Sequence, residues 1–250
     1  MGTPLVSIIT PAFRVAPIVG ATIESVLGQT CGDFEMLVVD DVSPDTTAAV
    51  VEGYAARDRR IRLLRHARNQ GPAGARNTAL AAAAGRYVAF LDADDLWLPN
   101  KLERQLAFMR EHRPAMSYTQ YRRVDESGRV ISSLIDVPDQ LDYQGLLKNT
   151  VITTSTVIVD RALTGPFQMR PVYYDDYVCW LAFLKREHTA RGCREDLTRY
   201  RVLGGSWSRN KLKSAAHVWR VYRDVERLPF PSAAWVFGNY AWNAVRKYRR

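Results

Sequence analysis

The sequence contains little cysteine. Its 250 residues include only Cys31, Cys179 and Cys193, an odd number without C-x-x-C spacing. The sequence therefore gives no support to a disulfide framework or a zinc site, and a reducing compartment, the cytoplasm, is the expected location.

Long apolar runs are also absent. Even the aromatic C-terminal region is interrupted by Pro231, Asn239 and Asn243, so no stretch reaches the roughly 18 to 20 apolar residues that span a bilayer. Met1 to Pro4 lead almost directly into an apolar run, with no basic region or cleavage site before it. We therefore expect neither a membrane-crossing helix nor a signal peptide.

Two further absences narrow the function. A dinucleotide-binding dehydrogenase would carry G-x-G-x-x-G after its first strand, where this chain has Pro11-Ala12-Phe13-Arg14-Val15. A nucleic-acid binder could use the net charge of +9, but residues 209–250 alone hold ten Lys or Arg against two acids, which leaves +1 for residues 1–208. Because no helix-turn-helix, RRM or zinc motif accompanies the basic tail, we expect no nucleic-acid partner.

Short apolar runs alternate with helical stretches through the N-terminal part of the chain. The expected strands are Leu5 to Thr10, Phe34 to Val39, Ile61 to Leu64 and Tyr87 to Leu91. The helices expected between them are residues 17–29, 46–57 and 74–84. This alternation predicts right-handed crossovers and an α/β fold with a doubly wound sheet. In such sheets ligands bind beyond the carboxyl ends of the strands.

After Asp95 the pattern becomes mixed α+β. The expected elements are a helix from about Asn100 to Glu111, a strand near Ala115 to Tyr121, a turn at Asp125 to Gly128, a strand from Thr154 to Val159 and a helix ending near Arg186.

The strongest chemical signal is Asp92-Ala93-Asp94-Asp95, directly after the fourth apolar run. Crowded carboxylates repel one another and need a cation, and Mg²⁺ or Mn²⁺ prefers carboxylate and phosphate oxygens. The segment predicts a divalent metal that bridges the protein and a diphosphate. A solvated loop whose acids cap the next helix is the alternative.

Three weaker signals lie at other expected strand and helix ends. Asp40-Asp41 could bind a ligand or serve as turn and capping residues. Arg76-Asn77 could be a surface pair, or the preceding glycine-containing loop could deliver the arginine to an anion. Phe13 and Arg14 could be loop residues or a stacking face for a base.

Together these segments resemble the bacterial family 2 glycosyltransferases, which are inverting enzymes of GT-A type. The matching stretches, in the family's order, are Val6 to Phe13, Val38 to Ser43, Asn69 to Asn77 and Phe90 to Trp97. The resemblance implies a GT-A type doubly wound mixed sheet within residues 1–208, followed by C-terminal helices at 209–250. Residues 1–110 would form a Rossmann-like nucleotide-sugar-binding half and residues 111–208 an α+β acceptor half.

The resemblance also implies transfer of a sugar from a nucleotide diphosphate donor, expected to be a UDP-sugar, to an acceptor hydroxyl. Phe13 stands where the family places an aromatic ring against uracil, Asp41 where a carboxylate accepts a base N–H, and Arg76 near the base. Asp92 is expected at the ribose, and Asp94 is the expected ligand of Mn²⁺ or Mg²⁺. The implied nucleotide-sugar-binding set is Pro11, Phe13, Asp41, Arg76, Asp92, Ala93 and Asp94.

Inverting transfer needs a base for the attacking hydroxyl. The segment that begins Asp175-Asp176 resembles the family's acidic pair before an aromatic helix, which implies Asp176 as the base and Asp175 as a supporting residue. Helix capping by both acids is the alternative. Tyr200 to Ser208 resembles a segment that closes over the donor, where Leu203 replaces a histidine that can reach the metal in several relatives. Phosphate contacts from this region would come from Arg201, Ser206 and Arg209.

The tail combines an expected amphipathic helix at 211–228 with a second segment that holds Trp235 and Trp242. Aromatic and basic residues suit peripheral contact with an anionic membrane on the inner face of the plasma membrane, although the aromatics could instead pack on the catalytic domain or on a second subunit of a homodimer. Membrane contact would favour a polyprenyl-diphosphate-linked saccharide acceptor in surface polysaccharide synthesis. The alternatives are a nucleotidyltransferase and a catalytically silent nucleotide-sugar binder.

Overall fold

The computed structural model describes residues 2–186, 190–204 and 211–248. Its N-terminal part is a parallel sheet built from β1 (Val6–Ala12), β2 (Phe34–Asp40), β3 (Ile61–Arg65) and β4 (Tyr87–Phe90). Strand β1 pairs with both β2 and β4, and β3 pairs with β2. The connecting helices are α1 (Val19–Leu27), α2 (Thr47–Ala55) and α3 (Gly71–Ala82). The predicted alternation of strands and helices is confirmed.

The sheet continues into the second half of the chain. The added strands are β5 (Leu96–Trp97), β6 (Met116–Val124), β7 (Gln140–Leu141), β8 (Ile158–Asp160) and β9 (Ala190–Arg201). The order across the sheet is β3-β2-β1-β4-β8-β6-β9-β5, with β7 paired to β9. Because β8 pairs antiparallel with β4 and β6 whereas β6 and β9 are parallel, the sheet is mixed.

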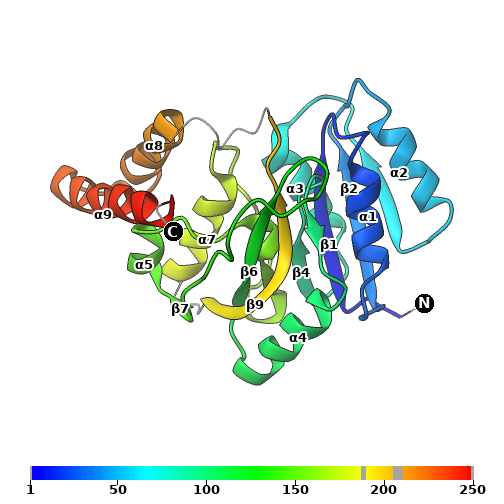
Figure 1. Ribbon diagram of the computed structural model, residues 1–250, viewed down its shortest axis with the longest axis horizontal. Coiled ribbons are helices and arrows are strands. Elements are labelled where there is room, and N and C mark those ends of the chain that lie inside the picture. The colour runs from blue at the N-terminus through cyan, green and yellow to red at the C-terminus, as the bar shows by residue number, and fades with distance from the viewer. Residues whose placement is uncertain (1, 187–189, 205–210, 249–250) are drawn as a thin grey trace.

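The remaining helices cover the two faces and the far end of this sheet (Figure 1). They are α4 (Lys101–His112), α5 (Tyr143–Leu147), the 3₁₀ turn η1 (Thr154–Thr156), α6 (Arg161–Thr164), α7 (Asp175–Lys185), α8 (Lys211–Arg220), the π turn η3 (Val221–Val225) and α9 (Phe230–Tyr248). Among the described residues, no helix is long and apolar enough to cross a bilayer.

Two predictions about strands need correction. The strand expected at Thr154 to Val159 is a 3₁₀ turn followed by the short strand β8, because the hydroxyl groups of this turn are used for buried hydrogen bonds that an extended chain would direct to opposite faces. The long strand β9 was not expected, because its many charged residues leave no simple apolar alternation. Those residues pair across the surface, for example Glu195 with Arg104 and Asp196 with Arg122.

The central strands are apolar on both faces, and each face has its own core. Ile8 of β1 belongs to the core under α1 and α4, whereas the next residue, Ile9, belongs to the core under α3 and α7. Successive side chains of a strand point to opposite faces, so a strand covered on both sides is mostly apolar, and the few polar residues inside β1 and β2, such as Ser7 and Glu35, bond to each other. Polar side chains that could meet a ligand therefore lie in the loops that follow the strands.

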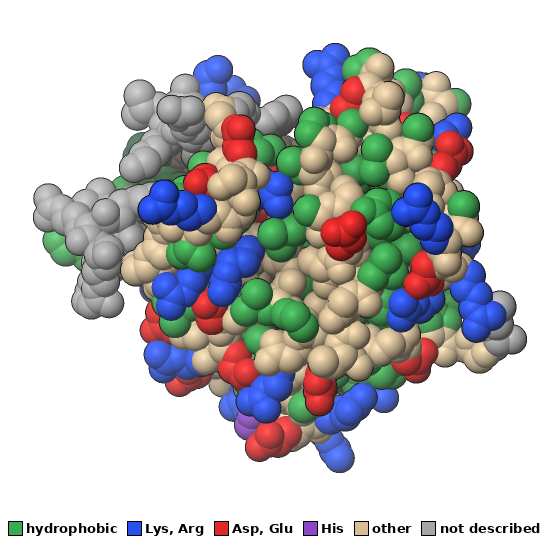
Figure 2. Space-filling model, turned by 45° about the vertical axis from the view of Figure 1, so that its right-hand side comes forward, with side chains coloured by type: hydrophobic (Ala, Val, Ile, Leu, Met, Phe, Trp, Pro, Cys, Tyr) green, Lys and Arg blue, Asp and Glu red, His purple; other side chains and the backbone are tan. Residues whose placement is uncertain are grey.

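The C-terminal helices pack on the second core. Val218, Tyr222, Ala233 and Val236 are buried in it, and Figure 1 shows α8 and α9 beside α5 and α7, at the end of the molecule opposite α2. The helix expected at 211–228 is α8 followed by η3. On the face of the molecule drawn in Figure 2, acidic and basic side chains are interspersed and no large patch of one sign is visible.

Candidate active site

The parallel pairing brings three strand ends together. Strands β2, β1 and β4 are neighbours in the sheet, and Ala12 of β1 lies in register with Asp40 of β2. Pro11, half-buried, is beside Val39 in the same register. The loops that follow these strands carry Phe13, Asp41 and the Asp92–Asp95 segment, so residues from three separate motifs share one edge of the sheet.

The loops after β1 and β2 hold each other in place. Arg14 and Val42 both have left-handed backbone conformations, with φ of 56° and 61°, which is rare for residues other than glycine. The N–H of Arg14 donates to Ser43 Oγ at 3.1 Å. The preceding residue, Phe13, is 42% exposed, and the Arg14 guanidinium lies 5.1 Å from the centroid of its ring. The loop therefore presents an open aromatic face next to a cation.

Asp41 anchors the start of α3. Its carboxylate accepts hydrogen bonds from the backbone N–H groups of Gln70 and Gly71, both at 2.8 Å. The Nδ1 atom of His66 lies 2.6 Å from Asp41 Oδ1, and His66 Nε2 lies 2.8 Å from Thr78 Oγ1. Gly71 has φ of +73°, so its lack of a side chain permits this turn. A carboxylate has about four acceptor positions, so one remains after these three contacts on a side chain that is 4% exposed.

Asp95 fastens the acidic loop to the sheet. It is 1% exposed, and its carboxylate accepts from Ser155 Oγ at 2.5 Å and from the backbone N–H of Arg201 at 2.8 Å. Ala93, which is buried, accepts a hydrogen bond from Thr22 Oγ1 through its carbonyl oxygen at 2.9 Å. Burial, with the neighbouring Asp94 and Asp92 carboxylates, raises the pKa of Asp95 well above its ordinary value. Asp95 thus has a structural position that the sequence did not reveal.

Asp94 is the acid in this loop whose environment calls for a cation. Burial first, and the Asp92 carboxylate second, raise the pKa of Asp94 to about 6, against the opposing effects of Arg201 and Arg76. Within the described residues, no group of three or more His, Cys, Asp or Glu could hold a metal ion. A carboxylate oxygen is a ligand that hard divalent ions accept, so Asp94 fits as a single protein ligand of an ion whose other ligands would come from a diphosphate and water.

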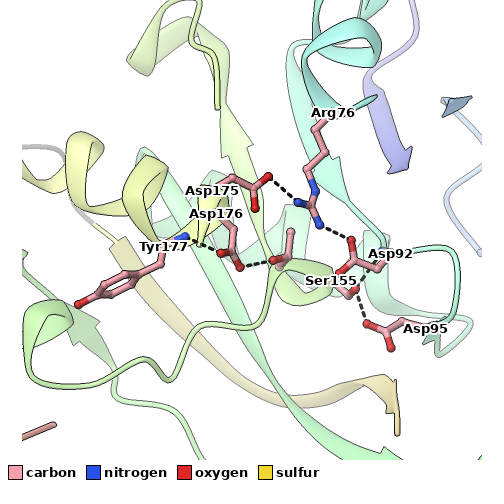
Figure 3. Close-up of polar contacts among 8 residues, drawn as sticks. Arg76, Asp92, Asp95, Ser155, Asp175, Asp176 and Tyr177 are labelled. Carbon is pink, nitrogen blue, oxygen red and sulfur yellow. Dashed lines mark hydrogen bonds and ion pairs between the residues drawn. The ribbon is translucent and has the colours of Figure 1, made fainter. Parts of the chain in front are cut away.

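Arg76 connects this loop to the start of α7. Its guanidinium donates to Asp92 Oδ1 at 2.6 Å and to Asp175 Oδ2 at 2.7 Å, and the side chain points from α3 into the space between them (Figure 3). Burial alone would lower the pKa of Arg76, but Asp92 and Asp175 raise it, so the group stays charged. Its position near the base stays a prediction.

Asp176 lies at the first turn of α7, beside Asp175 (Figure 3). Its Oδ1 atom accepts the N–H of Tyr177 at 2.7 Å, and its Oδ2 atom accepts a short hydrogen bond from Thr154 Oγ1. Asp175 is more buried, with 4% of its surface exposed, and that burial raises its pKa against the influence of Arg76. The pair therefore divides into an inner acid bound to arginine and an outer acid held by a hydroxyl.

Arg201 approaches the acidic loop from β9. The residue is buried, its guanidinium donates to the carbonyl of Glu126 at 3.3 Å, and its Nε atom is buried without a hydrogen-bond partner among the described residues. Buried donors normally have a hydrogen-bond partner, so the unpaired Nε fits an anionic ligand such as a phosphate. A bound cation would reduce the repulsion between that ligand and the acidic loop. Ser206 and Arg209, which were also expected at the phosphates, lie outside the described residues.

Sequence reasoning missed His66, Thr154 and Ser155. Ser155 is central to the site, because its hydroxyl contacts Asp95 and the N–H of Asp92, and its carbonyl accepts the Trp97 indole N–H at 2.8 Å. The available signal was the polar run Thr153 to Thr156, which a buried strand does not need. His66 had no signal of its own, since only the fold brings it to Asp41.

The sheet carries polar loops at the ends of three parallel strands, and its second half supplies the acidic pair at the start of α7, as expected for a GT-A type transferase fold. The chain belongs to glycosyltransferase family 2, since the profile of that family, described as Glycosyl transferase family 2, matches residues 7–165.

Sequence relatives agree with this assignment. The chain is 44% identical over 245 residues to TuaG of Bacillus subtilis, a protein named for teichuronic acid biosynthesis, covering 98% of this chain and 97% of TuaG. It is 37% identical over 245 residues to WfgD of Escherichia coli, named a UDP-Glc:α-D-GlcNAc-diphosphoundecaprenol β-1,3-glucosyltransferase, covering 98% and 95% of the two chains.

Solved structures share the fold at low identity. The mannosyltransferase PcManGT of Pyrobaculum calidifontis, solved with GDP-Man and Mn²⁺, matches with a TM-score of 0.73 at 19% identity over 96% of this chain and 74% of that one. TarS of S. aureus, residues 1–349 with UDP-GlcNAc, matches with a TM-score of 0.70 at 19% identity over 94% and 71%. The expected GT-A type mixed sheet is confirmed, and the family match favours sugar transfer over nucleotidyl transfer.

Proposed function

We propose that this glycosyltransferase uses a divalent metal to transfer a sugar, with inversion, from a UDP-sugar to the hydroxyl of a lipid-linked saccharide. The observation that carries the proposal is the Arg76 bridge. Through it, the acidic loop that would receive the donor and the acidic pair that would receive the acceptor are joined by two hydrogen bonds at 2.6 and 2.7 Å. Transfer requires these two groups of residues at a single place.

The donor's base would occupy the edge formed by the loops after β1 and β2. Phe13 offers an exposed ring for stacking, and Asp41 keeps one acceptor position for a base N–H. The preference for uracil is supported by WfgD, whose name specifies UDP-Glc, and by the TarS complex with UDP-GlcNAc. Asp92, partly exposed, would contact the ribose next to its bond with Arg76.

The metal would be held by Asp94, with diphosphate oxygens and water completing its coordination. When bound, Mn²⁺ or Mg²⁺ would supply Lewis-acid stabilisation of the departing diphosphate. Arg201, whose charge acts on Asp94, would add a donor toward the same phosphates, since its buried Nε lacks a partner among the described residues. The Mn²⁺ complex of PcManGT supports a divalent ion in this fold.

Asp176 would accept the proton of the attacking hydroxyl. The hydrogen bond from Thr154 and the bond from the Tyr177 N–H fix the orientation of its carboxylate, whereas Asp175 is occupied by Arg76. A general base must be held within hydrogen-bonding reach of the proton that it removes, and an ordered carboxylate at a helix start meets that need. Asp175 would act by holding Arg76 and the beginning of α7.

The acceptor class follows from the relatives and the tail. WfgD is named for a diphosphoundecaprenol-linked acceptor, and TuaG for teichuronic acid biosynthesis. A saccharide on a polyprenyl diphosphate lies at a membrane, so the enzyme would work at the inner face of the plasma membrane by peripheral contact.

The test is release of nucleoside diphosphate from UDP-, GDP- and dTDP-sugars in the presence of Mn²⁺, Mg²⁺ or EDTA. We expect metal-dependent release from a UDP-sugar, lost in Asp94→Ala and strongly slowed in Asp176→Asn. Asp139→Asn is the matched control, because the Asp139 side chain is 79% exposed and outside the site. Absence of both release and metal-dependent nucleotide binding for every donor would refute the proposal.

A further inference from the structure

The outer surface of α9 is apolar. Residues 228–245 contain no Asp, Glu, Lys or Arg. Within this stretch Ala233 and Val236 are buried in the core, whereas Trp235 and Trp242 leave 69% and 71% of their surface exposed. One side of the helix therefore attaches it to the protein, and its other side presents two large indole rings that no packing in the described structure requires.

The exposed residues of α9 share one side of the helix. Up to residue 243, and apart from Phe230 and Ser232 at the start of the helix, they recur at intervals of three or four positions, which is the helical repeat, and they are Pro231, Ala234, Trp235, Gly238, Ala241 and Trp242. Gly238 lies between the two tryptophans, and no atom lies within 4 Å of the position that a Cβ would take there. We call these six residues the α9 face. It is open and uncharged, with an aromatic ring toward each end.

Basic residues flank the α9 face. Arg220, Arg223 and Arg227 precede the helix and are exposed, and Arg246 and Lys247 follow in its last turns. Of the two acids in the tail, Asp224 is exposed, whereas the Glu226 side chain is buried and paired with Lys185 at 2.6 Å, so one acid alone offsets these charges on the surface. An apolar face with tryptophans and flanking cations matches a helix that lies in a membrane interface rich in anionic lipid.

The α9 face is also connected to the catalytic residues. The rings of Tyr173 and His217 stack at 3.6 Å with an interplanar angle of 2°, which joins α8 to the segment just before Asp175. At the other end of α7, Lys185 pairs with Glu226, next to η3. Helix α7 is thus fastened at both ends to the element that carries α9, so the orientation of the tail also fixes that of the acidic pair.

We propose that the α9 face is the docking surface of this enzyme for an anionic phospholipid bilayer, with α9 lying in the plane of the interface. This inference deepens the proposed function and rests on it for its purpose, since docking through α9 would present the acidic pair to a lipid-linked acceptor. A second copy of the chain is the competing occupant. The tail carries ten Lys or Arg against two acids, so pairing two copies through α9 would bring like charges together.

The experiment uses the full chain and vesicles made of equal parts phosphatidylglycerol and phosphatidylcholine, compared with pure phosphatidylcholine. We expect flotation with the anionic vesicles and a blue shift of tryptophan emission. In the double variant Trp235→Ser, Trp242→Ser, partition should fall about tenfold, because the apolar contribution to interface binding is removed. Ile131→Ser is the matched control, since Ile131 is an apolar side chain, 53% exposed, outside the tail.

The outcomes separate this inference from the proposed function. Release of nucleoside diphosphate from the soluble donor should be unchanged in the double variant, because neither tryptophan touches the site. Full-chain protein that ignores anionic vesicles, or a double variant that binds them equally well, would overturn docking through α9. A dimer that is seen by analytical ultracentrifugation, is lost in the double variant and occurs without vesicle binding would also overturn it. If the protein binds vesicles through the tryptophans but releases no nucleotide from any donor, docking would stand and the proposed transfer would be refuted.

Discussion

The loop after β4 and the start of α7 both carry adjacent aspartates, and in each region the two neighbouring acids have different surroundings. In the loop, Asp95 is buried and accepts hydrogen bonds from Ser155 and the Arg201 N–H. Asp94 is partly exposed, and burial with the neighbouring Asp92 raises its pKa to about 6. At α7, Asp175 is bound to Arg76, whereas Asp176 is held by Thr154. In both regions one acid of the pair is held by contacts within the protein, and the neighbouring acid is the one to which we assign a role in the proposed reaction.

The largest effect is expected from removing the charge of the outer acid at α7. Asp176→Asn should lower kcat by about 10³-fold while leaving nucleotide affinity nearly unchanged, because a general base acts mainly in the chemical step. Steady-state kinetics and calorimetric titration of UDP would measure the two quantities. If Asp176→Asn kept full turnover, the division of labour between Asp175 and Asp176 would have to be reversed.

The next largest effect concerns the bridge between the two regions. Arg76→Gln removes a buried cation and leaves Asp175 without its partner, which should destabilise the protein by about 3 kcal/mol. Urea unfolding followed by circular dichroism would measure it. Arg62→Gln is the control, because that salt bridge to Glu35 involves a side chain that is 46% exposed. Equal stability of the Arg76 and Arg62 variants would contradict a structural bridge.

Removing the metal ligand in the loop should act on the donor and not on the fold. Asp94→Asn, or EDTA added to the native protein, should reduce nucleoside diphosphate release by about 10²-fold, since a bound metal stabilises the leaving diphosphate by several kcal/mol. The thermal midpoint of the variant should stay close to that of the native protein. Activity of Asp94→Asn that still rises with added Mn²⁺ would place the metal elsewhere.

The smallest effect should come from the hydroxyl that holds the inner acid of the loop. Ser155→Ala removes a hydrogen bond to the buried Asp95 carboxylate and should cost about 2 kcal/mol of stability. Because Ser155 also contacts the N–H of Asp92, activity should fall modestly through the shape of the loop. Urea unfolding and kinetics on one preparation would test both, with Ser133→Ala, on the exposed loop after β6, as the control. Matching stability of the two variants would argue against Asp95 as an anchor.

Sequence patterns predicted those parts of the candidate site whose residues are close together in the chain. The strand ends at Asp40-Asp41 and Asp92 to Asp95 could be located because apolar runs and their polar ends are local patterns. The contacts that convert these motifs into a site are not local. Arg76 reaches Asp175 across 99 positions, and Asp41 meets His66 across 25.

Two structural errors have the same origin. Strand β9 follows no simple alternation, because its charged residues are neutralised by partners on α4 and β6 that only the folded chain supplies. The turn at Thr154 to Thr156 is set by the acids that its hydroxyls serve, Asp95 and Asp176. In both cases contacts with side chains distant in sequence decided the backbone conformation, and local propensity did not.

The hydrogen bond between the Arg201 N–H and Asp95 has a consequence for the order of synthesis. It spans 106 positions, so the loop that would bind the metal is completed only when residues near the C-terminal end of β9 have left the ribosome. Domains fold as their chain emerges, N-terminal parts first. A nascent chain that already contains every nucleotide-binding motif would therefore still lack a finished donor site, and the enzyme would acquire the capacity to cleave its donor only after residue 201 has emerged.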